Sequence, residues 1–213
     1  MSVYDLTQTI EAGMPVFPND PVVSLDQHAD MAETSYRVTA LHCGSHTGTH
    51  VDAPSHTEPD GATIDSFPAE RFALDAVLTD CRGLDPRDPI GPDQVPETDA
   101  DALVVRTGWD DHWGDPSYRD HPYLTPAAAE ACLKQGYDVA VDTLNPDPTP
   151  TDNAEPGEPA GFPVHHTLLG GDRLIFENLT NLDGVPDRFE LLAFPLEITD
   201  SDGAPVRAVG RQK

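Results

Sequence analysis

The segment TPAAAEACLKQGYDVAVD, residues 125–142, carries the clearest secondary-structure signals of this sequence and decides which fold it predicts. It opens with Thr125, a favoured N-cap residue, and Pro126, which suits the first turn of a helix. Gly136 is the residue type most often found just beyond a helix C-terminus. These signals predict a helix between the two ends, followed by a strand at 137–141.

Strands are expected on both sides of this helix. The wholly apolar run at 102–105 is typical of a strand buried on both faces, so residues 102–142 predict a β-α-β unit. Residues 72–80 alternate, and their apolar side consists of Phe72, Leu74, Ala76 and Leu78. The other expected strands are 3–10, 35–43, 174–176, 189–199 and 205–209. Strands then outnumber helices by about three to one, which predicts a mixed α/β domain built around β-structure.

Length and composition exclude several classes of protein. The 213 residues, 38% of them hydrophobic, are enough for a single folded domain over 1–213. No run approaches the roughly 18 apolar residues of a membrane span, and the N-terminal MSVYD has neither the basic nor the apolar part of a secretory signal. Three cysteines (Cys43, Cys81 and Cys132) without a C-x-x-C spacing indicate neither a disulfide framework nor a zinc ribbon. We therefore expect a cytoplasmic protein.

The charge balance is strongly acidic. Thirty-eight acidic residues, 27 of them aspartate, face only 12 basic residues, which gives a net charge of −26. Lys134 and Lys213 are the two lysines of the whole sequence. Such a surface repels phosphate backbones and anionic lipid, so neither nucleic acid nor a membrane is expected as a partner. We interpret the composition as adaptation to a salty cytoplasm; the alternative is an ordinary acidic protein.

A proline-rich segment at 144–163 interrupts the second half of the chain. It contains six prolines and four acidic residues and has no periodicity. Loops of this length are usually functional or disordered. The sequence leaves open an active-site or subunit-bridging loop and a plain solvated excursion.

The concentration of metal-binding side chains in HCGSHTGTHVDAPSH, residues 42–56, is the clearest chemical signal. Glycines, a proline and β-branched residues make a helix improbable here. In extended chain, His46, His50, Asp52 and His56 point to one face because their numbers share parity. One ion can bind His46, His50 and Asp52 together only if the chain bends, and Gly48 can supply the bend. Two imidazoles and one carboxylate leave coordination positions open, as a catalytic metal requires.

Cys43 and four further histidines are not expected to bind the ion. Cys43 has the opposite parity to the ligand set, so it is not expected to bind the ion. His42 is the expected outer hydrogen-bond partner of the cluster. His28, His112 and His121 are interpreted as structural or surface groups.

The run HTGTHVDAPSH, residues 46–56, matches the H-x-G-T-H-x-D-x-P-x-H motif of the cyclase-like metal hydrolase family without a departure. That family contains bacterial kynurenine formamidase and isatin hydrolase. Further resemblances follow in the family's order: YDLT at 4–7 with GMPVFP at 13–18, VRTGW at 105–109, VDT at 141–143, and VHHTLL at 164–169 with FENL at 176–179. The resemblance therefore covers nearly the whole chain.

The resemblance implies a compact, strand-rich β/β/α fold of the swivelling type and a metal site. His46, His50 and Asp52 resemble the ligands of a first divalent ion, zinc or manganese. Asp52 would bridge to a second ion held by His165 and Glu177, although some relatives use one ion. His165, three residues before the Leu-Leu pair, matches the family's histidine, and the adjacent His166 would point to the surface or to an outer shell.

His56 resembles the family's catalytic histidine. An imidazole with a pKa near 6.5 can take a proton from the attacking water and return one to the leaving nitrogen. Phe17 is the candidate aromatic wall for the substrate. The implied function is a metal-dependent amidohydrolase, with N-formylkynurenine as the leading substrate and a homodimer or homotetramer as the assembly. The alternatives are a lactam-opening hydrolase of isatin-like cyclic amides and a non-catalytic metal-binding module.

Overall fold

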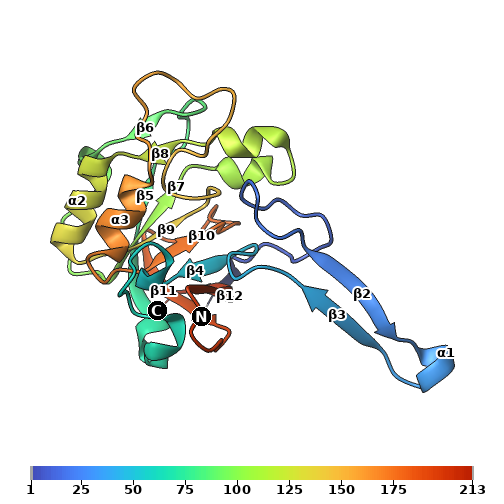
Figure 1. Ribbon diagram of the computed structural model, residues 1–213. Helices are drawn as coiled ribbons and strands as arrows, with labels where there is room; N and C mark the ends of the chain where they lie inside the picture. The colour runs from blue at the N-terminus through green and yellow to red at the C-terminus, as the bar shows by residue number, and fades with distance from the viewer. Residues whose placement is uncertain (1, 213) are drawn as a thin grey trace.

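A closed ring of strands forms the centre of the computed structural model, which describes residues 2–212 (Figure 1). The sheet order is β1-β12-β11-β5-β7-β9-β10-β4, and an additional pairing of β4 with β12 joins its ends. Seven strands therefore close on themselves, while β1 attaches to β12 outside the ring. The strands are β1 (Val3–Asp5), β4 (His50–Asp52), β5 (Ala73–Asp80), β7 (Ala102–Arg106), β9 (Asp138–Val141), β10 (Ile175–Glu177), β11 (Arg188–Pro195) and β12 (Gly203–Arg211). The expected strand-rich α/β fold is confirmed.

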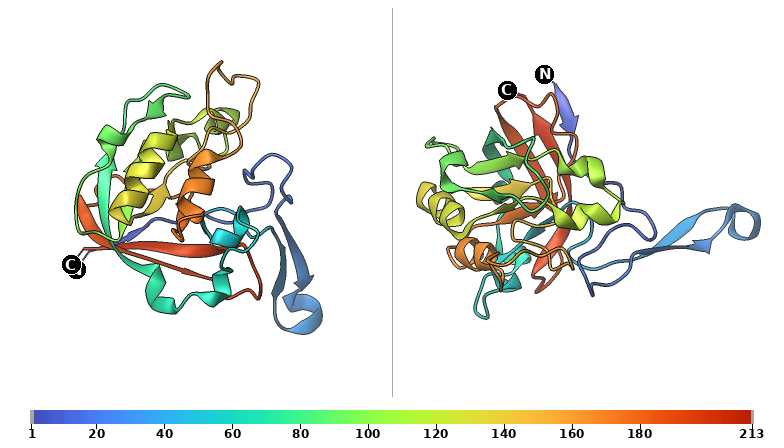
Figure 2. Two further views of the ribbon diagram at one scale, coloured as in Figure 1. Left: turned by 60° about the vertical axis from the view of Figure 1, so that its left-hand side comes forward. Right: turned by 90° about the horizontal axis from the view of Figure 1, so that it is seen from above.

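The predicted β-α-β unit forms as β7, α2 (Pro126–Gln135) and β9, with β7 and β9 parallel. The Thr125 hydroxyl accepts a hydrogen bond from the backbone N–H of Ala128, and Gly136 adopts φ +79° beyond the last turn. Helix α3 (Pro163–Leu169) packs beside α2 on the same side of the ring (Figure 2). Apolar residues of both helices pack against the outer side of β7 and β9.

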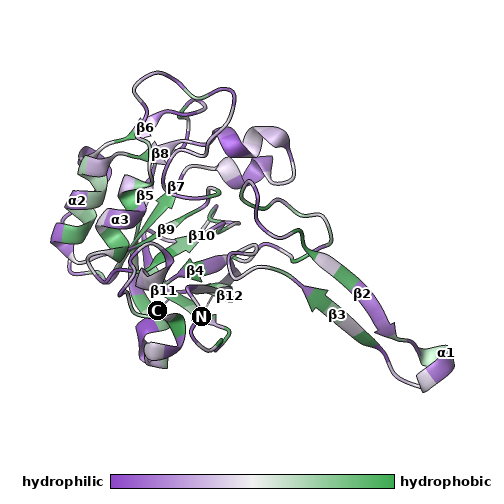
Figure 3. Cartoon of the chain, viewed as in Figure 1, coloured by the Kyte–Doolittle hydropathy of each residue, from purple (hydrophilic) through white to green (hydrophobic). Residues whose placement is uncertain are grey.

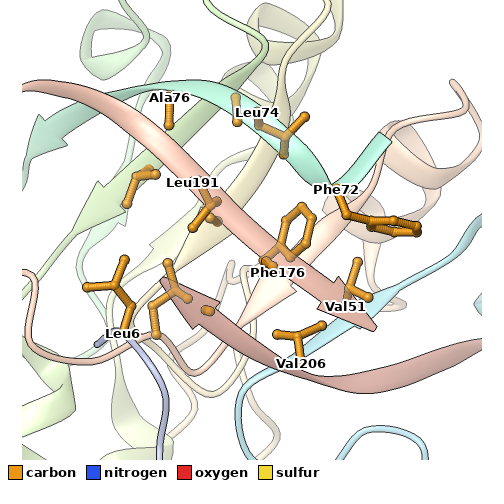
Figure 4. Packing of buried hydrophobic residues seen from close by; sticks show 14 of the residues in the cluster. Leu6, Val51, Phe72, Leu74, Ala76, Phe176, Leu191 and Val206 are labelled. Atoms are coloured by element: carbon orange, nitrogen blue, oxygen red, sulfur yellow. The ribbon is translucent and has the colours of Figure 1, made fainter. Parts of the chain in front are cut away.

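A second apolar cluster fills the ring itself (Figure 4). The alternating segment at 72–80 turns its predicted apolar side inward, because Phe72, Leu74, Ala76 and Leu78 are all buried there. Phe176 of β10 and Leu191 of β11 pack against them. The ring is thus a packed core, and polar side chains gather at the ends of its strands instead of inside it.

A long hairpin projects from this body (Figures 1 and 2). We call residues 24–42 the arm; it consists of β2 (Ser24–Ala29), α1 (Met31–Thr34) and β3 (Val38–His42). Figure 3 shows hydrophobic segments on both strands of the arm. Large apolar side chains lie exposed along the arm and at its base: Val22, Leu25, Met31, Tyr36, Val38 and Leu41. The predicted strand at 35–43 begins only at Val38, because Ser35 has a left-handed φ of 66° at the end of α1.

Two other predicted strands are shorter than expected. The strand at 3–10 ends at Asp5, after which Thr7 forms a single bridge with Leu179. The strand at 189–199 ends at Pro195. Short elements complete the fold: β6 (Pro89–Ile90), β8 (Tyr123–Leu124), η1 (Pro54–His56), η2 (Ile64–Ser66), η3 (Ala69–Phe72), η4 (Pro92–Gln94), η5 (Trp109–His112) and η6 (Pro116–Asp120). Over residues 2–212, every helix is too short or too polar to cross a membrane.

The proline-rich segment is held firmly at its beginning. Residues 144–149 are buried, and the Arg87 guanidinium binds the Thr149 carbonyl (3.1 Å), the Thr151 hydroxyl and the Glu158 carboxylate. Leu144, Asn145 and Phe162, at the two ends of the segment, line the cavity described below. The segment therefore forms part of a cavity wall and is not a plain solvated excursion.

Candidate metal centre and active site

Five side chains that the sequence singled out converge at one edge of the ring. His50 and Asp52 lie on the short strand β4, and Glu177 at the end of β10 pairs directly opposite His50. His165 lies on α3, and His46 lies in the loop before β4. Gly48 has φ +61°, so the chain bends where the sequence required a bend. Four of the five side chains therefore lie on strands or a helix, and His46 lies in a loop.

The distances within this cluster suit a shared cation. Asp52 Oδ1 lies 2.7 Å from His46 Nδ1 and 3.3 Å from His50 Nε2. Asp52 Oδ2 lies 3.5 Å from His165 Nε2, and the two Glu177 oxygens lie 3.3 Å from His50 Nε2 and from His165 Nε2. Ligand atoms that each sit about 2 Å from one ion are separated by about 3 Å. The two oxygens of Asp52 thus face two neighbouring sets of imidazole nitrogens.

Three buried atoms in this cluster have no hydrogen-bond partner within residues 2–212: His50 Nε2, Asp52 Oδ2 and Glu177 Oε1. Unpartnered buried polar atoms are costly, and charged ones most of all. All three are donor atoms typical of zinc or manganese sites. The residues therefore fit a divalent metal ion, which would satisfy the three atoms together.

The opposite nitrogen of each histidine is held by an oxygen acceptor. His50 Nδ1–H donates to the Gly48 carbonyl (2.8 Å), and His165 Nδ1–H donates to Asp147 (2.7 Å). His46 Nε2–H donates to Asp202 Oδ2 (3.0 Å). Metal-binding histidines usually donate their second N–H in this way, which fixes the ring and leaves the other nitrogen free for the ion.

Asp147 and Asp202 are functional residues that the sequence analysis missed. Asp147 stands in the proline-rich segment, and Asp202 directly precedes β12. His42, which was expected in this outer role, lies exposed at the end of β3, so that expectation is wrong. A carboxylate next to a glycine at a strand start was the one signal that could have pointed to Asp202.

The carboxylates of this cluster favour the protonated, positively charged form of the neighbouring imidazoles. Burial is the largest single effect on the pKa of His50 and lowers it, but the Asp52 charge and the hydrogen bonds to neighbouring carboxylates together raise the pKa to about 10. The pKa of His46 rises to about 9 for the same reason. Burial alone would raise the pKa of Asp52, yet the adjacent His46 and His50 charges hold it well below its usual value. A divalent ion would supply the same compensation and displace protons as it binds.

The remaining candidates lie around the same cavity, which has a volume of about 500 Å³. The His56 side chain is 32% exposed, and its ring centre lies 4.1 Å from that of His46. Phe17 lies edge-on to Phe162, with ring centres 6.0 Å apart, and both line the cavity. His166 does not line the cavity and pairs with Glu58 on the surface, as the resemblance implied.

Both the sequence and the fold of this chain are similar to those of known proteins. Residues 4–148 match the family model described as putative cyclase. Kynurenine formamidase of Salinibacter ruber (strain DSM 13855 / M31) is 30% identical over 220 residues, covering 99% of this chain and 98% of that protein. Kynurenine formamidase of Maricaulis maris (strain MCS10) is 33% identical over 218 residues, with the same coverage. In fold, the chain resembles an isatin hydrolase bound to the product analogue thioisatinate, with a TM-score of 0.86, 24% identity, and 98% and 91% of the two chains covered.

Proposed function

The chain belongs to the putative cyclase family, and we propose that it is a metal-dependent hydrolase that cleaves a non-peptide amide C–N bond. One observation carries this proposal: three unpartnered buried ligand atoms converge beside His56 at the wall of one cavity. A metal-binding module without catalysis would have no need of a histidine placed in that way.

We assign the residues as follows. His46, His50 and Asp52 hold a first divalent ion, zinc or manganese. Asp52 with His165 and Glu177 can hold a second. When bound, such an ion lowers the pKa of a water molecule and polarises a carbonyl group. His56 removes a proton from the attacking water and returns one to the leaving nitrogen. Phe17, with Phe162, forms a flat wall for an aryl group.

N-formylkynurenine is the leading substrate, and an isatin-like cyclic amide is the second candidate. The two relatives named formamidase are 30% and 33% identical over almost the whole chain, which favours an arylformamide. A cavity of about 500 Å³ with an aromatic wall suits a molecule built on one aromatic ring. The likeness to isatin hydrolase supports the fold and keeps the cyclic amide as the alternative.

The test is a screen of the purified protein against N-formylkynurenine and isatin, each with zinc and with manganese. We expect about one or two metal equivalents per chain and turnover that a chelator abolishes. Asp52→Asn should lose both metal and turnover because it removes a charged ligand. His42→Asn, on the exposed end of the arm, is the matched control and should keep both. Undiminished hydrolysis by chelated protein would overturn the proposal.

We also propose that the protein acts in the cytoplasm as a homodimer or homotetramer. Its three cysteines are free thiols, as in a reducing compartment. The arm supports an assembly of copies, because an isolated two-stranded hairpin with exposed Leu25, Tyr36 and Leu41 is marginally stable alone. Light scattering in molar KCl measures the mass of the assembly, and a monomeric mass would contradict the proposal. The double variant Leu25→Asp, Leu41→Asp should lower that mass. An unchanged mass would also contradict the proposal.

A further inference from the structure

We infer that Asp202 is a positioning residue for His56, holding its ring so that Nε2 faces the reacting water. This inference rests on the proposed function, since it assigns a partner to that function's proton carrier. Asp202 lies 146 residues beyond His56 in the chain, at the start of β12. Nothing in the local sequence around His56 indicates such a partner.

The contacts of the Asp202 carboxylate support this role. Its Oδ2 accepts hydrogen bonds from His56 Nδ1 at 3.2 Å and from His46 Nε2 at 3.0 Å. Its Oδ1 accepts a hydrogen bond from the Ser45 hydroxyl at 3.0 Å. One carboxylate therefore joins the proton carrier to the outer nitrogen of a proposed metal ligand. The ring centres of the two histidines are 4.1 Å apart, so their relative position is set at this carboxylate.

The backbone around Asp202 is held as firmly as its side chain. The Asp202 carbonyl accepts a hydrogen bond from Ala53 N–H (2.9 Å), and Gly203 pairs opposite Asp52 across the β4–β12 ladder. A Cβ atom on Gly203 would lie 2.7 Å from the Val51 carbonyl oxygen and 2.9 Å from His46 Cε1, so only glycine allows this approach. The backbone of Asp202 is thus anchored beside β4, the strand that carries His50 and Asp52, which places its carboxylate next to His56.

The chemical reason for a fixed carboxylate is the choice between two ring nitrogens. A neutral imidazole has one N–H and one basic nitrogen, and its partner decides which is which. With Nδ1–H donated to Asp202, the basic nitrogen is Nε2. Nε2 then takes a proton as the water O–H bond breaks and the C–O bond forms. It gives that proton to the nitrogen as the C–N bond breaks, while the carboxylate stabilises the intervening imidazolium.

The first test reads the tautomer directly and does not depend on turnover. ¹⁵N spectra of histidine-labelled, zinc-loaded protein should show His56 protonated on Nδ1, with the resonance identified by its loss in His56→Ala. In Asp202→Asn the proton should move toward Nε2. Asp200→Asn is the matched control, because it removes the same charge from the same loop at an exposed residue. An unchanged His56 tautomer in Asp202→Asn would overturn the inference.

The second test is a double-mutant cycle at saturating zinc. We expect Asp202→Asn to lower kcat for the amide about 10–100-fold, the usual effect of removing such an outer partner, with KM changed little. In the His56→Ala background the same substitution should change kcat less than about twofold. Equal losses in the two backgrounds would show that Asp202 acts through His46 or the fold, which contradicts the inference.

A third variant separates loss of the Asp202 carboxylate from misfolding, and the spectra separate this inference from the proposed function. Asp202→Glu keeps the carboxylate and should recover part of the rate and of the Nδ1-protonated form; Glu and Asn variants that behave alike would count against positioning. If the wild-type protein hydrolysed neither amide, the proposed function would fall, whereas the tautomer spectra would still decide the role of Asp202.

Discussion

At the scale of single residues, the two carboxylate oxygens of Asp52 face two different sets of histidines. Its Oδ1 faces His46 and His50, and its Oδ2 faces His165, so it joins the two halves of the metal centre. His56 stands beside this centre, and one of its nitrogens lies within 4.8 Å of ligand atoms on His46 and Asp52. Geometry therefore allows His56 either to carry the proton or to bind the ion.

His56→Ala distinguishes these two roles. If His56 carries the proton, the variant should keep its metal and its melting temperature while kcat falls roughly 10²–10⁴-fold. A substrate with a better leaving group, such as an activated ester, should lose less because it needs less proton donation. Metal content and turnover are measured on one preparation. Parallel loss of metal and activity would instead make His56 a ligand.

His121 should give the stability of the protein a distinct dependence on pH. Burial lowers its pKa to about 4, and its ring bonds to the Pro122 carbonyl and the Thr149 hydroxyl. The unfolded chain takes up the proton near pH 6.5, but the folded chain does so only near pH 4. The contribution of neutral His121 to the free energy of unfolding should therefore be fully present above about pH 6.5. The free energy of unfolding should fall by at most about 3 kcal/mol as the pH drops toward 4.

Urea unfolding at several pH values in molar KCl measures this effect. His121→Asn should be less stable at pH 7.5 and should show a shallower loss of stability between pH 6.5 and 4. His28→Asn, on the exposed arm, should keep the wild-type slope. Identical slopes for wild type and His121→Asn would refute the assignment.

At the scale of elements, Arg87 should determine the order of the proline-rich segment. Its side chain is 6% exposed and binds Glu158 through Nε and Nη2, Asp120 through Nη1, and the Thr149 carbonyl. Arg87→Ala would leave two largely buried carboxylates unpaired, which costs about 3 kcal/mol. We expect faster amide hydrogen exchange over residues 150–162, with little change in β7 and β9.

Arg82→Ala provides the comparison, because Arg82 is half-exposed and pairs with Asp80 and Asp183 at the surface. Its loss should change the free energy of unfolding much less than the loss of Arg87 does. If the two arginine variants lost similar stability, the segment would not depend on the Arg87 clamp.

The two main helices show which elements a sequence can predict. Helix α2 carries its own signals, Thr125 at the start and Gly136 at the end, and it forms between them. Helix α3 was not predicted, since Phe162 precedes it with a left-handed φ of 57° and has no capping side chain. Its first N–H groups are instead bound by Asp147, whose oxygens accept from Val164 and His165. A cap supplied from 17 residues away has no local signature.

The same distinction applies to the site. His46, His50 and Asp52 fall within seven consecutive residues, so their shared face could be inferred from parity. His165 and Glu177 came only through family resemblance, and Asp202 came through neither route. Strand pairing brings Asp202 to the site, and pairing between distant segments cannot be read from one sequence without structure.

At the scale of the whole molecule, the net charge of −26 should make stability depend on salt. Within residues 2–212 most arginines pair with carboxylates, but many exposed aspartates have no ion pair. Raising KCl from about 0.1 M to molar concentration shortens the Debye length from about 10 Å to about 3 Å, which removes repulsion between these charges. Each kcal/mol gained should raise Tm by about 2–4 °C.

Thermal melts in a KCl series measure this response, and sucrose at matched osmolality is the control for effects unrelated to charge. We expect a continuous rise in KCl that clearly exceeds the rise in sucrose. A Tm that does not change with KCl would contradict adaptation to a salty cytoplasm and would favour an ordinary acidic protein.

Closure of the ring by β12 also has a consequence for biosynthesis. β12 pairs with β1, β4 and β11, and it brings Asp202 to His46 and His56. A ribosome adding roughly 5–20 residues per second reaches Arg211 roughly ten to thirty seconds after Asp52. During that interval the nascent chain presents His46, His50 and Asp52 without the strand that orders them. The proposed metal site is therefore complete only after translation of β12, and an ion that needs the ordered site would bind after that step.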